Sequence, residues 1–339
     1  MKKVFYIALA ALAFAACAKT EANYTETQQI SFMPVSKFET KAAITGEKFT
    51  TDQNFYVFAN TVNEARYFEK VSFEPTSETT NGLTVYGGNP PQYWPNVVAL
   101  KFAGYTASGN TATAPWTLHK LFESLTVSNY TQPQPTDANA KNDFMWFFEC
   151  GTNNGGYVKP ATPVTPVMKH ACSWITINVM ADPELVAYWG NLQVENIRFV
   201  NLYETGTVTF PNAVNGVAAW DFDGQTKTQY VNIRTTSKPI AATPELASGV
   251  VEFADVPANT IVLPQTPTQL SVTYSYTTPA GVTGFTEEKI LSLNWDGDNN
   301  TAWAPGKHYT YNLTLTAEEI KIAPSSSDWT TGDNETIRF

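Results

Sequence analysis

The chain has 339 residues, of which 43% are hydrophobic and 15% are charged, so it can bury a sizeable core in more than one domain, and disorder is excluded for most of its length. Its 21 basic and 31 acidic residues give a net charge of -10, which argues against a nucleic-acid partner and against electrostatic adhesion to anionic membranes. The abundance of Thr, Tyr, Phe, Val, Asn, Pro and Gly favours strands and turns, and it predicts an all-β protein.

Residues 1–17 have the pattern of an export signal. Lys2 and Lys3 form a positive start, and the apolar run at 4–16 is too short to span a bilayer. The small residues before Cys17 predict either a lipid-bearing cysteine or an ordinary cleavage site with Cys17 as a bystander. We favour the lipidated cysteine, because the chain contains only three cysteines. Two or more acyl chains on Cys17 would hold the protein on a membrane.

A tether and a first strand are predicted next. Residues 18–27 are polar and lack a periodic apolar face, which is typical of a tether. Residues 28–35 alternate apolar and polar side chains, which predicts a half-buried strand with Ile30, Phe32 and Val35 as its apolar members. Pro34 predicts a peripheral position for this strand, because proline is tolerated at a strand's end or a sheet's edge.

Behind the first strand, Lys37 and Lys41 stand in an open polar segment that a protease could reach. Further strands of the N-terminal half are expected at 55–59, 68–73, 97–105 and 143–150.

Two stretches of the N-terminal half lack strand signals. Residues 106–142 are poor in them, and only Trp116–Leu125 has apolar residues at helical spacing, which predicts a short amphipathic helix. Residues 158–167 contain three prolines, which neither a helix nor a sheet interior accepts. We therefore expect a stiff spacer there and a boundary between an N-terminal domain at 28–160 and a C-terminal domain at 161–339.

The C-terminal half repeats short strands and turns. Asp223-Gly224 is a hairpin-type turn, and residues 183–190 are expected to make one helical turn. The predicted strands are 170–180, 192–202, 260–263, 270–276, 289–295 and 309–315. Strands that recur about every ten residues with turns between them indicate β-sandwiches, and two would fit the length.

The segment 318–339 is an extension beyond these strands. Apolar residues are spaced through a polar sequence with one proline, and they are Ile320, Ile322, Trp329, Ile337 and Phe339. Such an extension either packs against its own sheet or pairs with another molecule, and the sequence leaves both alternatives open.

No catalytic or metal-binding constellation is evident. His119, His170 and His308 show no metal-ligand spacing and are expected to be structural, and no nucleotide-binding or nucleophile motif is present. We expect no enzyme activity, no metal and no cofactor. Cys150 and Cys172 flank the spacer, and they are expected either to form a disulfide in an oxidising compartment or to be buried free thiols.

Several short motifs together resemble the fimbrillin family of Bacteroides-type lipoproteins over nearly the whole chain. The most specific run is Trp303-Ala304-Pro305-Gly306-Lys307-His308-Tyr309-Thr310-Tyr311. The other pieces are Ile30-Ser31-Phe32, Thr40-Lys41-Ala42, Tyr56-Val57-Phe58-Ala59, Tyr93-Trp94-Pro95, Asp143-Phe144-Met145, Met168-Lys169-His170-Ala171 and Leu263-Pro264-Gln265. The resemblance implies two transthyretin-like, Greek-key β-sandwich domains in tandem. It also implies export through the periplasm as an outer-membrane lipoprotein with palmitate on Cys17.

The resemblance further implies polymerisation into type V pili by strand exchange. A trypsin-like protease would cut between Lys41 and Ala42, with Lys37 as the second candidate, and would release the first strand with its Ile30, Phe32 and Val35. The donor strand would come from 318–339 of a neighbouring subunit. The chain departs from the family at Lys41, where many members have arginine, so an arginine-specific protease would not obviously serve.

Two functions are carried forward. The first is a fimbrial subunit or accessory subunit at the cell surface, with other fimbrial subunits and a host or bacterial surface receptor as partners. The second is a surface glycan-binding lipoprotein that does not polymerise, in which the first strand stays in place. For the second function, Trp94, Trp116 and Trp146 would stack on sugars, although they are equally suited to a core.

Overall fold

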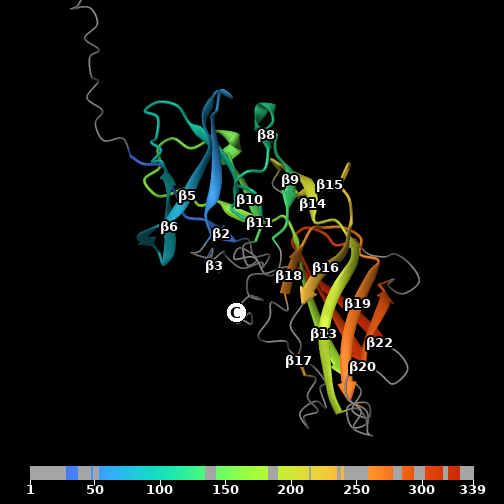
Figure 1. Cartoon of the computed structure of the whole chain (residues 1–339). Helices are drawn as coiled ribbons and strands as arrows, with labels where there is room; N and C mark the ends of the chain where they lie inside the picture. The colour runs from blue at the N-terminus through green and yellow to red at the C-terminus, as the bar shows by residue number, and fades with distance from the viewer. Residues whose placement is uncertain are drawn as a thin grey trace, which may run out of the picture.

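The computed structural model describes residues 28–36, 47–48, 53–133, 143–181, 190–213, 215–234, 238–239, 259–277, 285–293, 302–315 and 320–328 (Figure 1). Within these ranges the elements are β-strands and two short 3-10 turns, η2 (Lys120–Phe122) and η3 (Thr152–Asn154). The all-β prediction is therefore confirmed. None of the helical elements in these ranges is long and apolar enough to cross a membrane.

The largest sheet has nine strand segments in the order β1-β6-β5-β4-β7-β10-β11-β2-β3. They are β1 (Ser31–Phe32), β2 (Val35–Ser36), β3 (Glu47–Lys48), β4 (Phe55–Thr61), β5 (Arg66–Thr80), β6 (Leu83–Asn89), β7 (Leu100–Thr106), β10 (Met145–Glu149) and β11 (Val167–His170). β4, β5, β7 and β10 confirm the strands expected in this half. Asn81 and Gly82, both with positive φ, make the tight turn between β5 and β6.

β1 and β2 lie near opposite ends of this order, although they belong to one continuous segment. β1 pairs antiparallel with β6, and β2 pairs parallel with β11. Phe32 also forms a parallel bridge with Val164, just before β11. The segment 28–36 therefore joins the two edges of the sheet, which closes into a barrel. We call residues 28–36 the closing segment.

Alternate faces of the barrel strands supply two cores. Phe55 and Val57 of β4 belong to the cluster inside the barrel, which also contains Phe32, whereas Phe58 belongs to a second cluster outside it. This division follows from the two-residue period of a strand, which sends successive side chains to opposite faces.

A four-stranded sheet in the order β15-β14-β9-β8 covers the outer face of the barrel. Its strands are β8 (Trp116–Leu118), β9 (Ser124–Thr131), β14 (Thr205–Pro211) and β15 (Ala219–Asp221). Leu125 and Val208 of this sheet share the second cluster with Phe58 and Tyr105 of the barrel. The covering sheet and the barrel therefore form one packed unit.

Two further sheets lie at the other end of the molecule (Figure 1). One has the order β18-β12-β21-β22 and the other β16-β13-β19-β20, with β17 paired to β13. Their strands are β12 (Ser173–Ala181), β13 (Gly190–Leu202), β16 (Thr228–Arg234), β17 (Lys238–Pro239), β18 (Asn259–Val262), β19 (Gln269–Thr277), β20 (Phe285–Ser292), β21 (Lys307–Leu315) and β22 (Ile320–Asp328). These overlap every strand predicted for the C-terminal half.

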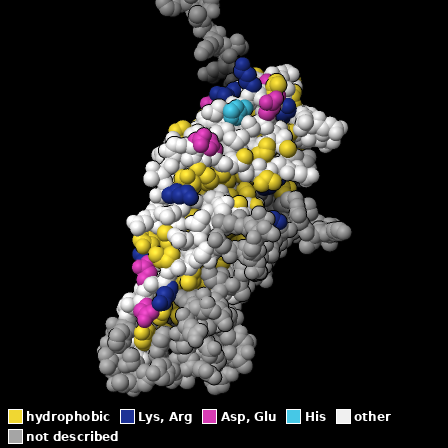
Figure 2. Space-filling view, turned by 90° about the vertical axis from the view of Figure 1, so that its right-hand side faces the viewer, with side chains coloured by type: hydrophobic (Ala, Val, Ile, Leu, Met, Phe, Trp, Pro, Cys, Tyr) yellow, Lys and Arg dark blue, Asp and Glu magenta, His cyan; other side chains and the backbone are white. Residues whose placement is uncertain are grey.

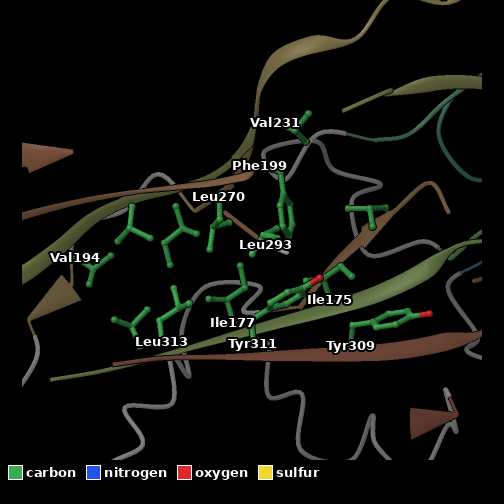
Figure 3. Close-up of a cluster of buried hydrophobic side chains, with 14 of the residues drawn as sticks. Ile175, Ile177, Val194, Phe199, Val231, Leu270, Leu293, Tyr309, Tyr311 and Leu313 are labelled. Carbon is green, nitrogen blue, oxygen red and sulfur yellow. The ribbon is translucent and has the colours of Figure 1, made fainter. Parts of the chain in front are cut away.

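The two C-terminal sheets face each other across a third hydrophobic cluster. Figure 3 shows Ile177 and Leu313 of the first sheet opposite Val194, Phe199 and Leu270 of the second. Along β21 the buried and half-buried residues alternate as predicted for 309–315. The two sheets are therefore held together by apolar burial between their inner faces.

The helix predicted over Trp116–Leu125 is wrong. The chain makes β8, the turn η2 and then β9, and Leu118 pairs with Leu125 across the hairpin. Leu121 and Phe122 have positive φ, which an α-helix excludes, and Leu121 is exposed. The helical spacing arose because the apolar residues on both arms of this hairpin point to one side.

Two predictions concern turns. Asp223 and Gly224 form the expected turn after β15, with Gly224 at φ +74°. The helical turn predicted at 183–190 lies, apart from Gly190, outside the described residues.

The proline spacer, predicted to be unsuited to a sheet interior, pairs along one side with the closing segment. Val164 bridges to Phe32, and the carbonyl oxygens of Val164 and Pro166 accept hydrogen bonds from the closing segment. Proline lacks the backbone N–H but keeps its carbonyl, so Pro166 serves on the side where an acceptor is needed. The spacer is therefore one wall of the site that holds the closing segment.

Sheet pairing crosses the predicted domain division at 160 and 161. β14 follows that division in sequence, yet it pairs with β9 from Thr205↔Thr131 to Pro211↔Ser124. The chain thus returns from β13 to the covering sheet of the barrel. The division remains a prediction about folding units, but it does not separate hydrogen-bonded sheets.

Short connections join the barrel unit to the C-terminal sheets. Ala171 and Cys172 link β11 to β12, and Tyr203 and Glu204 link β13 to β14. The buried side chain of Gln265 forms hydrogen bonds with both backbone polar groups of Tyr203 in the second connection. The Tyr203 N–H donates to Gln265 Oε1 at 2.8 Å, and Gln265 Nε2 donates to the Tyr203 carbonyl at 2.8 Å.

Candidate functional site

The closing segment is hydrogen-bonded on both sides. On one side, the Ile30 N–H donates to the Gln92 carbonyl at 2.7 Å, and β1 continues this pairing to β6. On the other side, Met33 N–H donates to the Val164 carbonyl at 2.8 Å, and Val35 N–H donates to the Pro166 carbonyl at 3.0 Å. The first strand is therefore an internal strand.

The peripheral position predicted from Pro34 is accordingly wrong. Met33 and Val35 direct their N–H groups to the spacer, so residue 34 between them faces the opposite side. On that side the pairing with β6 ends at Phe32, and β3 begins to pair at Val35. Pro34 occupies the one place where no N–H is required.

The side chains of the closing segment are part of the barrel core. Ile30 is 1% exposed, Phe32 0% and Val35 4%, and Met33 and Pro34 are also buried. The Phe32 ring lies edge-on to Phe73 and Phe102, with centroid distances of 4.8 and 5.1 Å. Its other aromatic neighbours, each with a centroid about 6 Å away, are Phe55 and Phe147. We call the space inside these four rings the Phe32 pocket.

Burial sets how firmly the closing segment is held. Burying Ile30, Phe32, Met33 and Val35 at about 1.5–3 kcal/mol each contributes roughly 6–12 kcal/mol as an upper estimate. That range is comparable with the whole stability of a typical domain. A cut in the chain next to the segment would therefore not release it by itself. Release requires another strand that replaces much of this burial and the backbone pairing.

Beside the segment, Glu149 supports the beginning of β11. Its Oε2 accepts the Tyr157 hydroxyl at 2.8 Å, and its Oε1 accepts the Val167 N–H at 3.4 Å. Burial raises the pKa of the Glu149 carboxyl, and the hydrogen bonds from Tyr157 and Val167 oppose that rise. Val167 in turn pairs with Val35, so Glu149 is one residue removed from the closing segment.

The predicted processing positions lie outside the described residues. These are Cys17, Lys37, Lys41 and Ala42. β2 ends at Ser36, and β3 begins at Glu47 and pairs with it. Both predicted cuts therefore fall in the connection between two paired strand segments, and these cuts remain predictions.

At the other end of the sequence, β22 pairs with β21 over its whole length, from Leu315↔Ile320 to Lys307↔Asp328. Ile320 and Ile322 thus belong to a strand of the chain's own sheet. Among the strands that the structure describes, β22 is the last of that sheet and pairs on one side, with β21. The other donor candidates, Trp329, Ile337 and Phe339, lie outside the described residues, and the donor role stays a prediction.

Both cysteines within the described ranges are free and buried. Of the two alternatives for Cys150 and Cys172, the structure has the free thiols. Burial raises the pKa of both, which keeps the thiols protonated and unreactive. Both lie in the cluster between the barrel and its covering sheet.

The histidines lie apart and bind neighbouring side chains. His170 Nδ1 contacts Asp143 Oδ2, and His119 Nε2 lies 2.9 Å from Thr126 Oγ1. The His308 ring stacks on Trp174 with centroids 3.9 Å apart. Among the residues that the structure describes, no group of three or more metal-binding side chains occurs.

The tryptophans considered for sugar stacking are mainly core residues. Trp94 and Trp146 are buried, and the half-buried Trp116 packs on Phe58 with centroids 4.6 Å apart. On the face seen in Figure 2, charged side chains of both signs are scattered among uncharged ones. Neither observation points to a stacking platform or a charged groove.

Sequence reasoning found the apolar residues of the closing segment but missed their partners. The missed residues are the acceptors Gln92, Val164 and Pro166 and the four rings of the Phe32 pocket. The available signal was the spacer itself, because a proline-rich run can offer carbonyls to a neighbouring strand.

Comparison with known proteins gives the following matches. The family model described as fimbrillin-like matches residues 40–329. A fimbrial protein from Bacteroides vulgatus has a similar structure, with TM-score 0.57 and 15% identity over 89% of this chain and 99% of that chain. A protein from Bacteroides uniformis named for cell adhesion follows, with TM-score 0.54 and 17% identity over 89% of this chain and 98% of that chain. At these identities the structural likeness shows the fold, and no curated protein matches.

Proposed function

Because the chain belongs to the fimbrillin-like family, we propose that it is a subunit or accessory subunit of a type V pilus that serves cell adhesion at the cell surface. The family is non-enzymatic. The observation that carries the proposal is the closing segment, a buried internal strand that lies just before the predicted cleavage positions.

Polymerisation follows from removing that strand. Cleavage after Lys41, or after Lys37, separates the closing segment from the rest of the chain. Its loss leaves the carbonyls of Gln92 and Val164 unpaired and the Phe32 pocket empty, and both costs are relieved when a neighbouring subunit inserts a strand. Because the burial is large, cleavage and exchange are separate steps, and the incoming strand must displace the old one.

Export and anchoring complete the proposal. The precursor carries a signal at 1–17 and acyl chains on Cys17, and the tether at 18–27 connects the lipid to the closing segment. Cleavage after Lys41 then releases the lipid and the closing segment together. Other fimbrial subunits, the outer membrane and a surface receptor are the partners.

The finer fold belongs to the same proposal. The barrel with its covering sheet and the pair of C-terminal sheets are two transthyretin-like sandwiches in tandem. Support comes from their separate inner cores and from the short connections between them.

The test is cleavage of the purified precursor with a trypsin-like protease, followed by electrophoresis without boiling. We expect a ladder of oligomers from the wild type and none from a variant truncated after Ala317. The double variant Lys37→Gln/Lys41→Gln should block the ladder, and the two single variants show after which of the two lysines the cut falls. If the cleaved wild type stays monomeric and retains residues 28–35, the polymerisation proposal is wrong. Binding to polysaccharide by that monomer would instead support the glycan-binding function.

A further inference from the structure

Exposed apolar side chains gather at the end of the barrel where the closing segment begins. They make up four of the seven large hydrophobic residues that are exposed within the described ranges, and they are Val97 (88% exposed), Val158 (65%), Tyr93 (42%) and Tyr67 (39%). We call these four residues the rim. Single exposed apolar residues need no explanation, but several around one point indicate a contact surface.

Hydrogen bonds fix two loops on either side of Gln28, the first residue of the closing segment. The Trp94 N–H donates to the Gln28 carbonyl at 3.0 Å. Gln28 Nε2 donates to the Pro160 carbonyl at 2.7 Å. The loop 90–99, which carries two rim residues, and the loop 151–166, which carries a third, therefore flank the start of the closing segment.

The rim residues are also joined across these loops. The Tyr67 hydroxyl donates to the Tyr93 carbonyl at 2.8 Å, which holds the start of β5 against the first loop. Leu100 and Tyr157 exchange both backbone hydrogen bonds, at 3.0 and 2.8 Å. Val158 therefore lies beside the residues that come just before Leu100, and the rim is a single surface.

The two loops of the rim contain almost no charge. Residues 90–99 include no charged side chain, and Lys159 is the only one in 151–166. Exposed loops in an acidic chain with a net charge of -10 would be expected to share its acidic residues. Their absence leaves an apolar surface that does not repel anionic headgroups.

The acidic residues near Tyr67 are paired with basic ones. Glu64 lies 3.1 Å from the Lys101 ammonium, and Glu69 contacts the Arg66 guanidinium. These pairs add no net charge beside the rim. The rim therefore differs from the chain as a whole, whose charge argues against electrostatic adhesion to membranes.

The sequence limits how far the rim can lie from a membrane. Ten residues, 18–27, separate the predicted lipid-bearing Cys17 from Gln28, and an extended chain of that length spans about 35 Å. A short tether keeps the rim at an effective concentration on the order of millimolar at the lipid surface. Weak apolar contacts are then sufficient for binding.

We propose that the rim docks on the lipid surface to which the precursor is anchored. This inference rests on the proposed lipid anchor and adds a second contact to it. Val97 and Val158 enter the boundary between headgroups and acyl chains. Tyr67 and Tyr93 lie at the same level, which suits tyrosine because its ring is apolar and its hydroxyl is polar.

Docking would orient the closing segment relative to the membrane. The segment starts at the rim with Gln28 and ends at Ser36, which lies about 25 Å further along an extended chain. The predicted cuts after Lys37 and Lys41 follow Ser36. The connection that contains them would therefore start away from the lipid surface, where a soluble protease has access.

The first test measures the depth of single positions in the full-length lipidated precursor. The precursor is placed on vesicles of phosphatidylethanolamine and phosphatidylglycerol in which some headgroups carry a nitroxide quencher. A fluorescent probe is attached at Val97→Cys or, as the control in the C-terminal half, at Ile290→Cys, another exposed apolar position. Cys150 and Cys172 do not compete for the label, because both are buried and burial raises the pKa of both thiols.

The probe at position 97 should be quenched at least about threefold more strongly than the probe at position 290, because only the first lies at the lipid boundary. Equal quenching at the two positions would overturn the inference.

The second test removes apolar surface from the rim while the probe stays at position 97. Val158→Asp should reduce the quenching at least about threefold, because a carboxylate does not enter the lipid boundary. Val217→Asp is the matched control outside the rim, since Val217 is also exposed (58%). It should leave the quenching within about a fifth of the unsubstituted value. Thermal unfolding checks that both variants are folded, and undiminished quenching in folded Val158→Asp would contradict the proposal.

The outcomes separate this inference from the proposed function. If mass spectrometry finds no acyl chain and the precursor does not float with vesicles, the lipid anchor fails and the inference fails with it. If the precursor floats but position 97 is not quenched, the anchor stands and the docking of the rim is wrong. A probe signal at position 97 that changes with protein concentration without vesicles, and is not quenched on them, would overturn docking on lipid and assign the rim to contacts between copies.

Discussion

The closing segment and β22 lie near opposite ends of the sequence, and they are held in opposite ways. The closing segment pairs on both sides and buries its apolar residues in a barrel core. β22 pairs on one side as the last strand of an open sheet. Removing the first segment therefore opens a closed structure, whereas removing the last strand shortens a sheet.

Under the proposed strand exchange, this difference would let one chain serve both as acceptor and as donor. An acceptor must lose much apolar burial and backbone pairing when its strand leaves, because regaining them drives the uptake of a replacement strand. A donor must lose little when its strand engages a neighbour. In the proposed exchange, the closing segment would meet the first requirement and the C-terminal segment 318–339 the second.

The largest expected effect comes from deleting the segments themselves. Without residues 1–36, the barrel loses roughly 6–12 kcal/mol of apolar burial, which is the order of a domain's total stability. We expect this variant to lose cooperative unfolding of the barrel, as measured by calorimetry and tryptophan fluorescence. Deletion of residues 320–339 should cause a smaller change. Equal melting temperatures for the two deletions would contradict the comparison.

A single substitution should reproduce part of that loss. Phe32→Ala removes the ring from among four phenylalanines, and we expect it to lower the free energy of unfolding by about 3–5 kcal/mol. Ser31→Ala, on the neighbouring half-buried residue, should change it by less than about 0.5 kcal/mol. Urea unfolding of the full-length precursor measures both. A cost for Phe32→Ala as small as the control's would mean that the closing segment is not held by its core contacts.

The smallest expected effect is a dependence of stability on pH that comes from Glu149 in the barrel. Burial raises the pKa of Glu149 in the folded chain, so its contribution to stability declines as pH rises from the ordinary carboxyl pKa through the raised one. Glu149→Gln removes this ionisation. Relative to wild type, the variant should gain melting temperature between acidic and neutral pH, while other carboxyls cancel in the difference. If the melting temperatures of wild type and variant change with pH in parallel, the ionisation of Glu149 does not lower the stability.

How much of the fold could be predicted from the sequence depends on whether the pattern within a strand also identifies the strands that pair with it. Alternation at 309–315 predicted β21 correctly, because one face of that strand is buried and the other is not. The same rule identified Ile30 and Phe32 as buried. It could not show that strands distant in sequence pair on both sides of them, because pairing leaves no periodic trace in a single strand.

Proline and hairpin signals failed for related reasons. Pro34 and each spacer proline lack a backbone N–H. Whether this costs a hydrogen bond depends on which side of the strand its neighbour lies. At Trp116–Leu125, two short arms of a hairpin placed their apolar residues at spacings that imitate a helix. The sequence carries the local preference, and the tertiary neighbours decide its outcome.

The connections at Ala171-Cys172 and Tyr203-Glu204 have a mechanical consequence. Three lengths of chain cross between the halves, because residues 222–227 also lead from β15 into β16, and Gln265 fixes one crossing through both backbone polar groups of Tyr203. Tension applied between the two halves is therefore divided among three covalent crossings. A pull on one half is transmitted to the other as a displacement of the whole body, with little bending at the junction.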